Sequence, residues 1–417
     1  MAEKLYDITN ELHSVGRMHL SVHRPKEKTE NSDIVIYTLH TANYLTFGPI
    51  VELAKRGFTT CASQPTKPMS VGYFRIQDVL LSIKNAVEYI KNELKPRKLI
   101  LMGHSQGGCY MSAYQYIAEN GTSRFKNNGR FIPFPDLPEL PGGDGLMLLD
   151  SNYGIMGVLS MDPGARAYDN GYARIPELDP FNPENGYKPN ASEFTEDFIR
   201  RYQKAQIKMY QDLLDYCKER YDRIQRGLGQ FEDDEPLVVA GCHRGSYNNK
   251  IFGHDARLLS RTSKSAPLLH KDGTVTSDAI VRTVRPFKDT RSPRNYTSGA
   301  LTTTVMNILE DEVRFFDDFG YDECNMWGID GNFNYMSTRE NVKYIHVPLL
   351  ITGNTASHEF VNAEFNFDDA VSKDKELVMV EGATHMFDPL NDSYGDTLGV
   401  AADYFTKWLT KPGRFTE

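Results

Sequence analysis

One stretch, Lys98–Ala118, constrains the fold more than any other part of the chain. An apolar run (Leu99–Met102) is followed by the turn Gly103–Gly108, which reads Gly-His-Ser-Gln-Gly-Gly, and then by the helix-compatible segment Cys109–Glu119. Glycines two positions before and after Ser105 remove the Cβ atoms that would collide in a sharp strand-to-helix turn. We therefore expect the Ser105 hydroxyl to project above a sheet, next to the unpaired N–H groups of the following helix.

Strand and helix patterns alternate through the first part of the chain. Parallel strands joined by helical crossovers give this alternation, and they form an α/β sheet covered by helices on both faces. The alternation resumes near the end with two strands and a helix. The predicted strands are 17–25, 33–39, 58–62, 98–102, 145–150, 347–353 and 376–380, and the predicted helices of this part are 47–55, 76–94, 109–119 and 398–409.

The alternation is interrupted between Ser151 and about Lys343. We predict a long helix over 190–226 capped by Asn190, short strands at 237–240 and 279–284, and a helix over 302–316. The sequence thus predicts two parts: a mostly parallel, doubly covered core (1–151 and 344–417) and a large, mainly helical cap inserted within it (152–343).

A serine hydroxyl is a weak nucleophile at neutral pH and needs a positioned base, for which histidine has the most suitable pKa. His385 fits this role by its place in the chain. It ends the sequence Gly382-Ala383-Thr384-His385, directly after the last predicted strand. This loop is expected at the same edge of the sheet as Ser105.

Four features together resemble the α/β-hydrolase superfamily: Gly-His-Ser-Gln-Gly, the strand and helix order around it, the late Gly-Ala-Thr-His loop, and the insertion between the strands 145–150 and 347–353. In that family these two strands correspond to the sixth and seventh core strands. The resemblance covers about residues 17–151 and 345–412. It implies that Ser105 is the nucleophile and His385 the general base. It also implies an oxyanion hole formed by the N–H of Gln106 and a second donor near Thr41.

The acid of the triad is left open by the sequence. The family usually places it in a pattern such as Gly-x-x-Asp after the seventh strand, but Gly353-Asn354-Thr355-Ala356 has alanine there. Asp150 at the end of the sixth strand is preferred, because a strand end holds a carboxylate in a fixed orientation. Glu359, in the loop after the seventh strand, is the alternative.

These residues predict a serine hydrolase that cleaves an ester-like bond, in a carboxylic ester, lactone or thioester, through an acyl-enzyme. The same triad would also serve a carbon–carbon bond hydrolase or an acyltransferase, and a catalytically silent protein that binds a ligand or a partner is the alternative of another class. Aromatic residues of the cap either line a pocket for a small or medium apolar substrate or pack the cap itself. They are Phe315, Phe316, Phe319, Tyr321, Trp327, Phe333 and Tyr335.

Charge and composition argue against several classes of binding partner. A net charge of −9 without a basic cluster argues against nucleic acid, and no apolar run is long enough to span a membrane. Five dispersed cysteines and a polar N-terminus predict a cytoplasmic protein. Neither a cofactor nor a metal is expected, since the spacing of Cys242, His243 and His254 matches no zinc template. The expected partner is a small-molecule substrate, and the sequence is compatible with a homo-oligomer.

Overall fold

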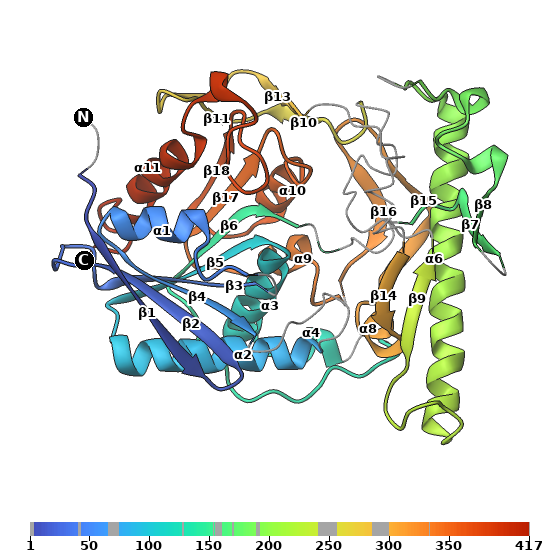
Figure 1. The fold of residues 1–417 in the computed structure, drawn as a ribbon, viewed down its shortest axis with the longest axis horizontal. Coiled ribbons are helices and arrows are strands. Elements are labelled where there is room, and N and C mark those ends of the chain that lie inside the picture. The colour runs from blue at the N-terminus through green and yellow to red at the C-terminus, as the bar shows by residue number, and fades with distance from the viewer. Residues whose placement is uncertain are drawn as a thin grey trace.

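The computed structural model describes residues 4–40, 43–65, 75–126, 129–152, 154, 161–168, 171–188, 192–240, 257–285, 300–332 and 334–416. Within these residues, a sheet of ten strands lies in one half of the molecule, on the left in Figure 1. In spatial order, its strands are β1 (Ile8–Val15), β2 (Met18–Pro25), β4 (Thr59–Pro65), β3 (Ile34–Leu39), β5 (Lys98–Ser105), β6 (Gly145–Ser151), β17 (Leu349–Asn354), β18 (Lys375–Val380), β11 (Leu268–Leu269) and β12 (Val275–Thr276).

The inner strands are parallel, from β4 across to β11, whereas β1, β2 and β12 are antiparallel to their neighbours. Strands β3 and β6 are buried along their whole length, as expected when helices cover both faces of a sheet. Strand β1 was not predicted. It lies at the sheet edge with most side chains exposed, so its polar sequence lacks the apolar run that identifies an inner strand.

Successive residues of a strand belong to two different hydrophobic clusters, one on each face of the sheet. Ile36 and Ile100 pack with α1 (Gly48–Lys55) and α11 (Thr397–Leu409). Tyr37 and Leu101 pack on the opposite face, together with helices α2 (Ile76–Tyr89), α3 (Gln106–Asn120), α9 (Thr338–Val342) and α10 (Asn362–Asp369). A π-helical turn, η1 (Ile90–Leu94), extends α2. The predicted α/β fold with a mostly parallel, doubly covered sheet is confirmed.

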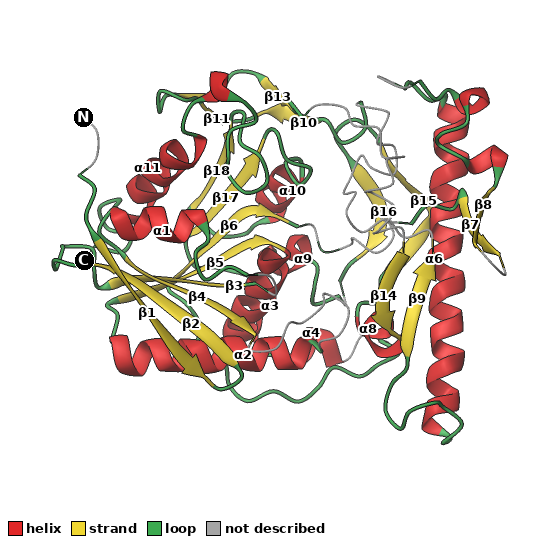
Figure 2. Ribbon diagram, in the orientation of Figure 1, coloured by secondary structure: helices red, strands yellow, loops and turns green. Residues whose placement is uncertain are grey.

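Between β6 and β17 the chain forms a second, mixed group of elements (Figure 2). The long helix α6 (Glu196–Gln225) lies on the side of the molecule farthest from the main sheet, with strand pairs between the two. The described parts of this region also contain the pairs β7 (Ala165–Tyr168) and β8 (Gly171–Arg174), β9 (Pro236–Ala240) and β14 (Ala300–Thr304), β10 (Arg261–Ser265) and β13 (Ile280–Arg282), and β15 (Arg314–Tyr321) and β16 (Met326–Asp330). The described part of the region is therefore mixed rather than mainly helical.

Short helices complete the described chain: α4 (Ser123–Lys126), α8 (Val305–Glu310), η2 (Pro176–Leu178), η3 (Pro183–Asn185) and η4 (Asp392–Tyr394). Strands β11 and β12 fall inside the range 152–343, yet they extend the main sheet beside β18. Part of the sequence that was expected to form the cap thus belongs to the sheet edge. The division into core and cap otherwise stays a prediction.

Two helix predictions in this region differ from the structure. Helix α6 begins at Glu196, because the Thr195 hydroxyl accepts a hydrogen bond from the N–H of Phe198 at 3.2 Å. The predicted cap, Asn190, lies outside the described residues. The helix expected over 302–316 is wrong, because its threonine-rich start pairs with β9 as β14, and only the short α8 follows before β15.

The aromatic residues of this region mostly serve packing. Phe319, Tyr321 and Tyr335 are buried, and the Tyr321 hydroxyl donates a hydrogen bond to Gln206 of α6 at 3.0 Å. Phe316 and Trp327 are exposed at the surface, and Phe333 lies outside the described residues. The Tyr335 ring packs against Phe125 and Phe134. These contacts favour packing over the lining of a substrate pocket.

Candidate active site

The turn between β5 and α3 has the strained geometry expected at Ser105. Its backbone has φ 55° and ψ −130°, a conformation that residues other than glycine rarely adopt. A Cβ at Gly103 would lie 2.5 Å from the Cα of Gly108, and a Cβ at Gly108 would lie 1.8 Å from the Ser151 Oγ. Glycine at these two positions therefore lets β5, α3 and β6 approach closely around the serine.

His385 and Asp150 are brought together although they are far apart in the sequence. The His385 Nδ1 lies 2.6 Å from the Asp150 Oδ2, and the other carboxylate oxygen accepts the Asn354 N–H at 2.9 Å. The Asp150 side chain is fully buried, whereas 23% of the His385 side chain is exposed. A buried carboxylate against Nδ1 leaves Nε2 as the basic nitrogen of the imidazole.

Asp150 reaches this position because β6 ends with an unusual backbone turn. Asp150 has φ 42°, and its N–H donates to the Thr352 hydroxyl on β17 at 3.3 Å. This turn directs the carboxylate toward the loop that follows β18. Ser105 is close to the same strand end, because its carbonyl oxygen accepts the Asn152 N–H at 2.9 Å.

Glu359, the alternative acid, lies in the loop after β17. Its buried carboxylate contacts the His358 Nε2 at 3.3 Å and the side-chain amide of Asn362. The His358 ring in turn lies 4.6 Å from the His385 ring, between centroids. The carboxylate that lies directly against the Nδ1 of His385 is that of Asp150.

Ser357 is a neighbour of His385 that the sequence did not identify. Its hydroxyl lies 3.3 Å from the His385 Nδ1 and accepts the Glu359 N–H at 3.1 Å. Because Asp150 is 0.7 Å closer to the same nitrogen (3.3 − 2.6), it is the principal acceptor of the Nδ1 proton. The sequence signal was present, since Ser357 follows Ala356 in the loop where the family usually carries its acid.

Of the two residues predicted for the oxyanion hole, the structure describes Gln106 but not Thr41. Gln106 is the first residue of α3, where backbone N–H groups have no partner within the helix. Thr41 lies outside the described residues. His40, the residue before it, is buried against Tyr44, with ring centroids 4.1 Å apart. Burial and repulsion from His385 lower the pKa of His40 to about 4.

Ring nitrogens of His104 and His385 and a carboxylate oxygen of Asp150 lie within 4.8 Å of one another, a spacing that could suit a metal ion. Both nitrogens of His104 are engaged in hydrogen bonds, and the Nδ1 of His385 is bonded to Asp150, so the arrangement is accounted for by hydrogen bonding. Cys242, His243 and His254 lie outside the described residues. In the described parts of the chain, we find no helix with the length and hydrophobicity to cross a membrane.

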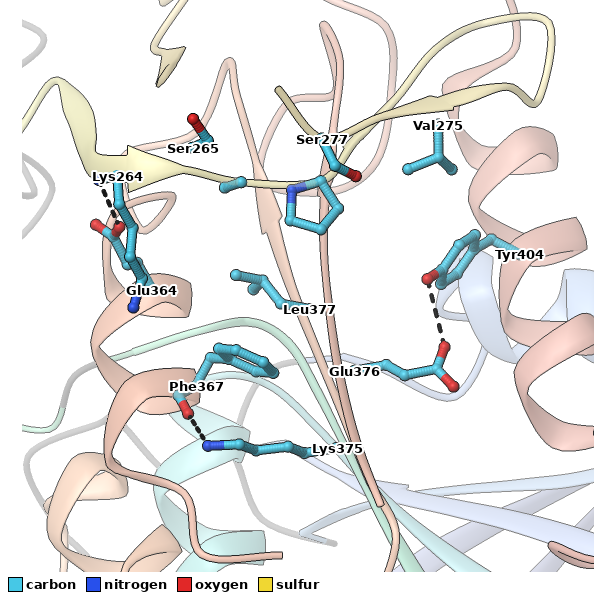
Figure 3. Close-up of a pocket in the computed structure, with 12 residues that line it drawn as sticks. Lys264, Ser265, Val275, Ser277, Glu364, Phe367, Lys375, Glu376, Leu377 and Tyr404 are labelled. Atoms are coloured by element: carbon cyan, nitrogen blue, oxygen red, sulfur yellow. Dashed lines mark hydrogen bonds between the residues drawn. The ribbon is translucent and has the colours of Figure 1, made fainter. Parts of the chain in front are cut away.

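A pocket of about 370 Å³ lies beside Lys375, Glu376 and Leu377 in the first half of β18 (Figure 3). The loop with His385 follows the other end of this strand. Its charged side chains have partners: Lys375 donates to the carbonyl oxygens of Phe367 and Ala370 at 2.7 and 2.6 Å, and the Tyr404 hydroxyl donates to Glu376 at 3.4 Å. None of the predicted site residues lines this pocket. It is therefore separate from the Ser105 site.

No family model matches the chain, and neither does any curated protein sequence. Among solved structures, a hypothetical protein from Pseudomonas aeruginosa is similar, with 13% identity, 97% of this chain and 94% of that chain covered, and a TM-score of 0.45. Est1E from Butyrivibrio proteoclasticus has 10% identity, coverage of 96% and 99%, and a TM-score of 0.43. The siderophore hydrolase EstB from Aspergillus fumigatus has 10% identity, coverage of 97% and 98%, and a TM-score of 0.42.

Proposed function

We propose that this chain is a serine hydrolase of the α/β-hydrolase type that cleaves an ester bond. Ser105 is the nucleophile, His385 the general base and Asp150 the acid. The observation that carries the proposal is the 2.6 Å contact between His385 and the fully buried Asp150, at the sheet edge where the strained turn presents Ser105. This is the arrangement of groups that activates a serine hydroxyl.

The proposed reaction has two halves. The Ser105 Oγ attacks the carbonyl carbon while His385 Nε2 takes the hydroxyl proton, and Asp150 stabilises the imidazolium that forms. When the tetrahedral intermediate collapses, the carbon–oxygen bond of the ester breaks and His385 gives the proton to the leaving alcohol. Water then attacks the acyl-enzyme with the same proton transfers, which releases the acid and restores Ser105.

The negative oxygen of the intermediate needs hydrogen-bond donors. The N–H of Gln106 is suited to this role, because it opens α3 and the positive end of the helix dipole points the same way. A second donor from the loop that contains Thr41 is part of the proposal. Removing one such donor costs a typical enzyme about 10²–10³-fold in kcat.

We further propose that residues 152–343, apart from the two strands of the sheet edge, cover the site as a cap and select a small or medium organic substrate. The same triad would act on lactones and thioesters, which also pass through a tetrahedral oxyanion.

The four described cysteines are free and buried. They support a reducing compartment such as the cytoplasm.

The test is reaction with a fluorophosphonate probe, combined with hydrolysis of a panel of chromogenic esters that differ in acyl length. The folded protein should be labelled at Ser105, and Ser105→Ala should lose labelling and at least about 10⁴-fold in kcat. A protein that neither reacts with the probe nor hydrolyses any ester faster than Ser105→Ala would contradict the proposal. That result would favour a binding protein that has kept the fold.

A further inference from the structure

His104, the residue before Ser105, is fully buried, and both of its ring nitrogens have defined partners. Nε2 lies 2.7 Å from the main-chain carbonyl oxygen of His385, and Nδ1 lies 2.6 Å from the Tyr44 hydroxyl. A carbonyl oxygen can only accept, so Nε2 carries the proton. Nδ1 of a neutral ring must then accept, and the Tyr44 hydroxyl donates to it.

Its surroundings keep this imidazole neutral. Aromatic rings enclose it, with centroids at 4.7 Å for Phe47, 5.7 Å for Tyr44 and 6.1 Å for Phe387. Burial lowers the pKa of His104 well below 6.5, and repulsion from His385 and His40 adds to this effect. The two hydrogen bonds therefore keep their direction at neutral pH.

We propose that His104, held by Tyr44, is a positioning residue that fixes His385 relative to the nucleophile. Other bonds hold the base loop next to His385: the Thr384 carbonyl oxygen accepts the Asn354 side-chain amide at 2.8 Å, and the Thr384 N–H donates to the Asp388 carbonyl oxygen at 2.8 Å. His104 instead holds the carbonyl oxygen of His385 itself. Because His104 is covalently joined to Ser105, one hydrogen bond links the nucleophile strand to the base loop.

This inference rests on the proposed hydrolase function, since positioning matters only if Ser105 and His385 react together. A displacement of about 1 Å between reacting groups can cost about 10²-fold in rate. The bond from His104 acts on that distance directly. Its loss should therefore lower kcat and leave KM unchanged, because the substrate is not touched.

The first test compares His104→Leu with His104→Gln. Leucine fills a similar volume without a donor, whereas glutamine places an amide N–H near the former Nε2. We expect kcat to fall about 10- to 100-fold in His104→Leu, most of it to return in His104→Gln, and KM to stay constant in both. Equal losses in the two variants, or a loss expressed only in KM, would overturn the inference.

The second test asks whether Tyr44 acts through His104. Tyr44→Phe should lower kcat severalfold in the wild-type background and have no further effect in His104→Leu. Tyr37→Phe is the matched control. Tyr37 is also fully buried, and its hydroxyl forms a hydrogen bond with the Ser63 Oγ at 2.7 Å. It lies on the opposite face of the main sheet from Tyr44. An equal effect of Tyr44→Phe in both backgrounds would show that the two residues act independently and would contradict the inference.

The third test does not depend on activity. The proton between the Nδ1 of His385 and Asp150 should give a low-field NMR signal, which disappears in Asp150→Asn. We expect this signal to shift or broaden in His104→Leu and to recover in His104→Gln. If the signal is the same in the wild type, His104→Leu and His104→Gln, His104 does not hold His385. If the signal responds as expected but no ester is cleaved, the proposed function fails and the positioning contact stands.

Discussion

Two buried aspartates lie in different surroundings. Asp150 is at the end of strand β6 of the main sheet, and Asp162 is in the region between β6 and β17. In the latter region, Asp162 accepts hydrogen bonds from Arg174 at 2.9 Å, from the Tyr202 hydroxyl at 3.1 Å and from the Gly164 N–H at 3.0 Å. Its partners include a permanent cation, so the group has a structural role. Asp150 faces an imidazole that is partly open to solvent. A buried carboxylate is suited to proton transfer when its partner can gain and lose a proton.

The largest expected effect comes from Asp150→Asn. The amide cannot accept the Nδ1 proton in the same way and favours the wrong tautomer of His385, so kcat should fall by about 10³–10⁴-fold. Steady-state hydrolysis of a chromogenic ester measures this loss. The free energy of unfolding should change much less than the activity.

Two variants sharpen this comparison. Glu359→Gln should lower kcat by less than about tenfold, since Glu359 contacts His358 and Asn362. Asp162→Asn should leave kcat unchanged and lower the free energy of unfolding by about 2 kcal/mol, because Arg174 loses a buried partner. If Glu359→Gln were as damaging as Asp150→Asn, the assignment of the acid would have to be revised.

Two glycines should respond to alanine by different amounts. Gly108→Ala places a Cβ 1.8 Å from the Ser151 Oγ and should lower the free energy of unfolding by about 3 kcal/mol, with loss of activity. Gly227, just past the C-terminal end of α6, has φ 70°, and a Cβ added there would meet none of the surrounding atoms within 4 Å. Gly227→Ala should therefore cost only about 1 kcal/mol, for the backbone conformation alone. Urea unfolding measures both changes, and equal losses would remove the proposed difference between the regions.

Acid should destabilise the main sheet through His40. The folded-state pKa of about 4 lies below the ordinary value of 6.5, so the unfolded chain binds the proton more readily. The contribution of His40 to the free energy of unfolding is therefore fully present above about pH 6.5 and is lost as the pH falls toward 4. The loss due to His40 is about 2 kcal/mol at pH 5. His40→Gln should show a weaker decrease between pH 7.5 and 5 than the wild type, and parallel curves would exclude His40 as the cause.

The opposite sign is expected in the region between β6 and β17. Burial raises the pKa of Asp311 from 3.8 to about 7, although Asn334 donates a hydrogen bond to it. Its stability contribution is complete below pH 3.8 and is lost as the pH rises through 7. Asp311 is partly exposed, so Asp311→Asn should stabilise the protein by only about 1–2 kcal/mol at pH 8. If Asp311→Asn stabilises the protein no more at pH 8 than at pH 5, this expectation is wrong.

The sheet elements were predictable to the extent that their patterns are local. Strand β5 and helix α3 follow from an apolar run, a glycine-rich turn and a helical segment next to one another. Strand β14 was missed, because Thr302 and Thr303 become a strand only when β9 pairs with them. The two-residue strand β11 is equally undetectable without β18 beside it.

The sequence by itself determined the position of Ser105 in a strained turn and of His385 in the loop after the last strand of the predicted core, because neighbouring residues encode both features. The sequence preferred Asp150 and kept Glu359 as an alternative acid, and only the tertiary structure shows that the Asp150 carboxylate lies against the Nδ1 of His385. That pairing joins residues 235 positions apart and depends on the turn at the end of β6. The contact from His104 to the His385 carbonyl is likewise visible only in three dimensions, since it requires two sheet elements and a loop to meet.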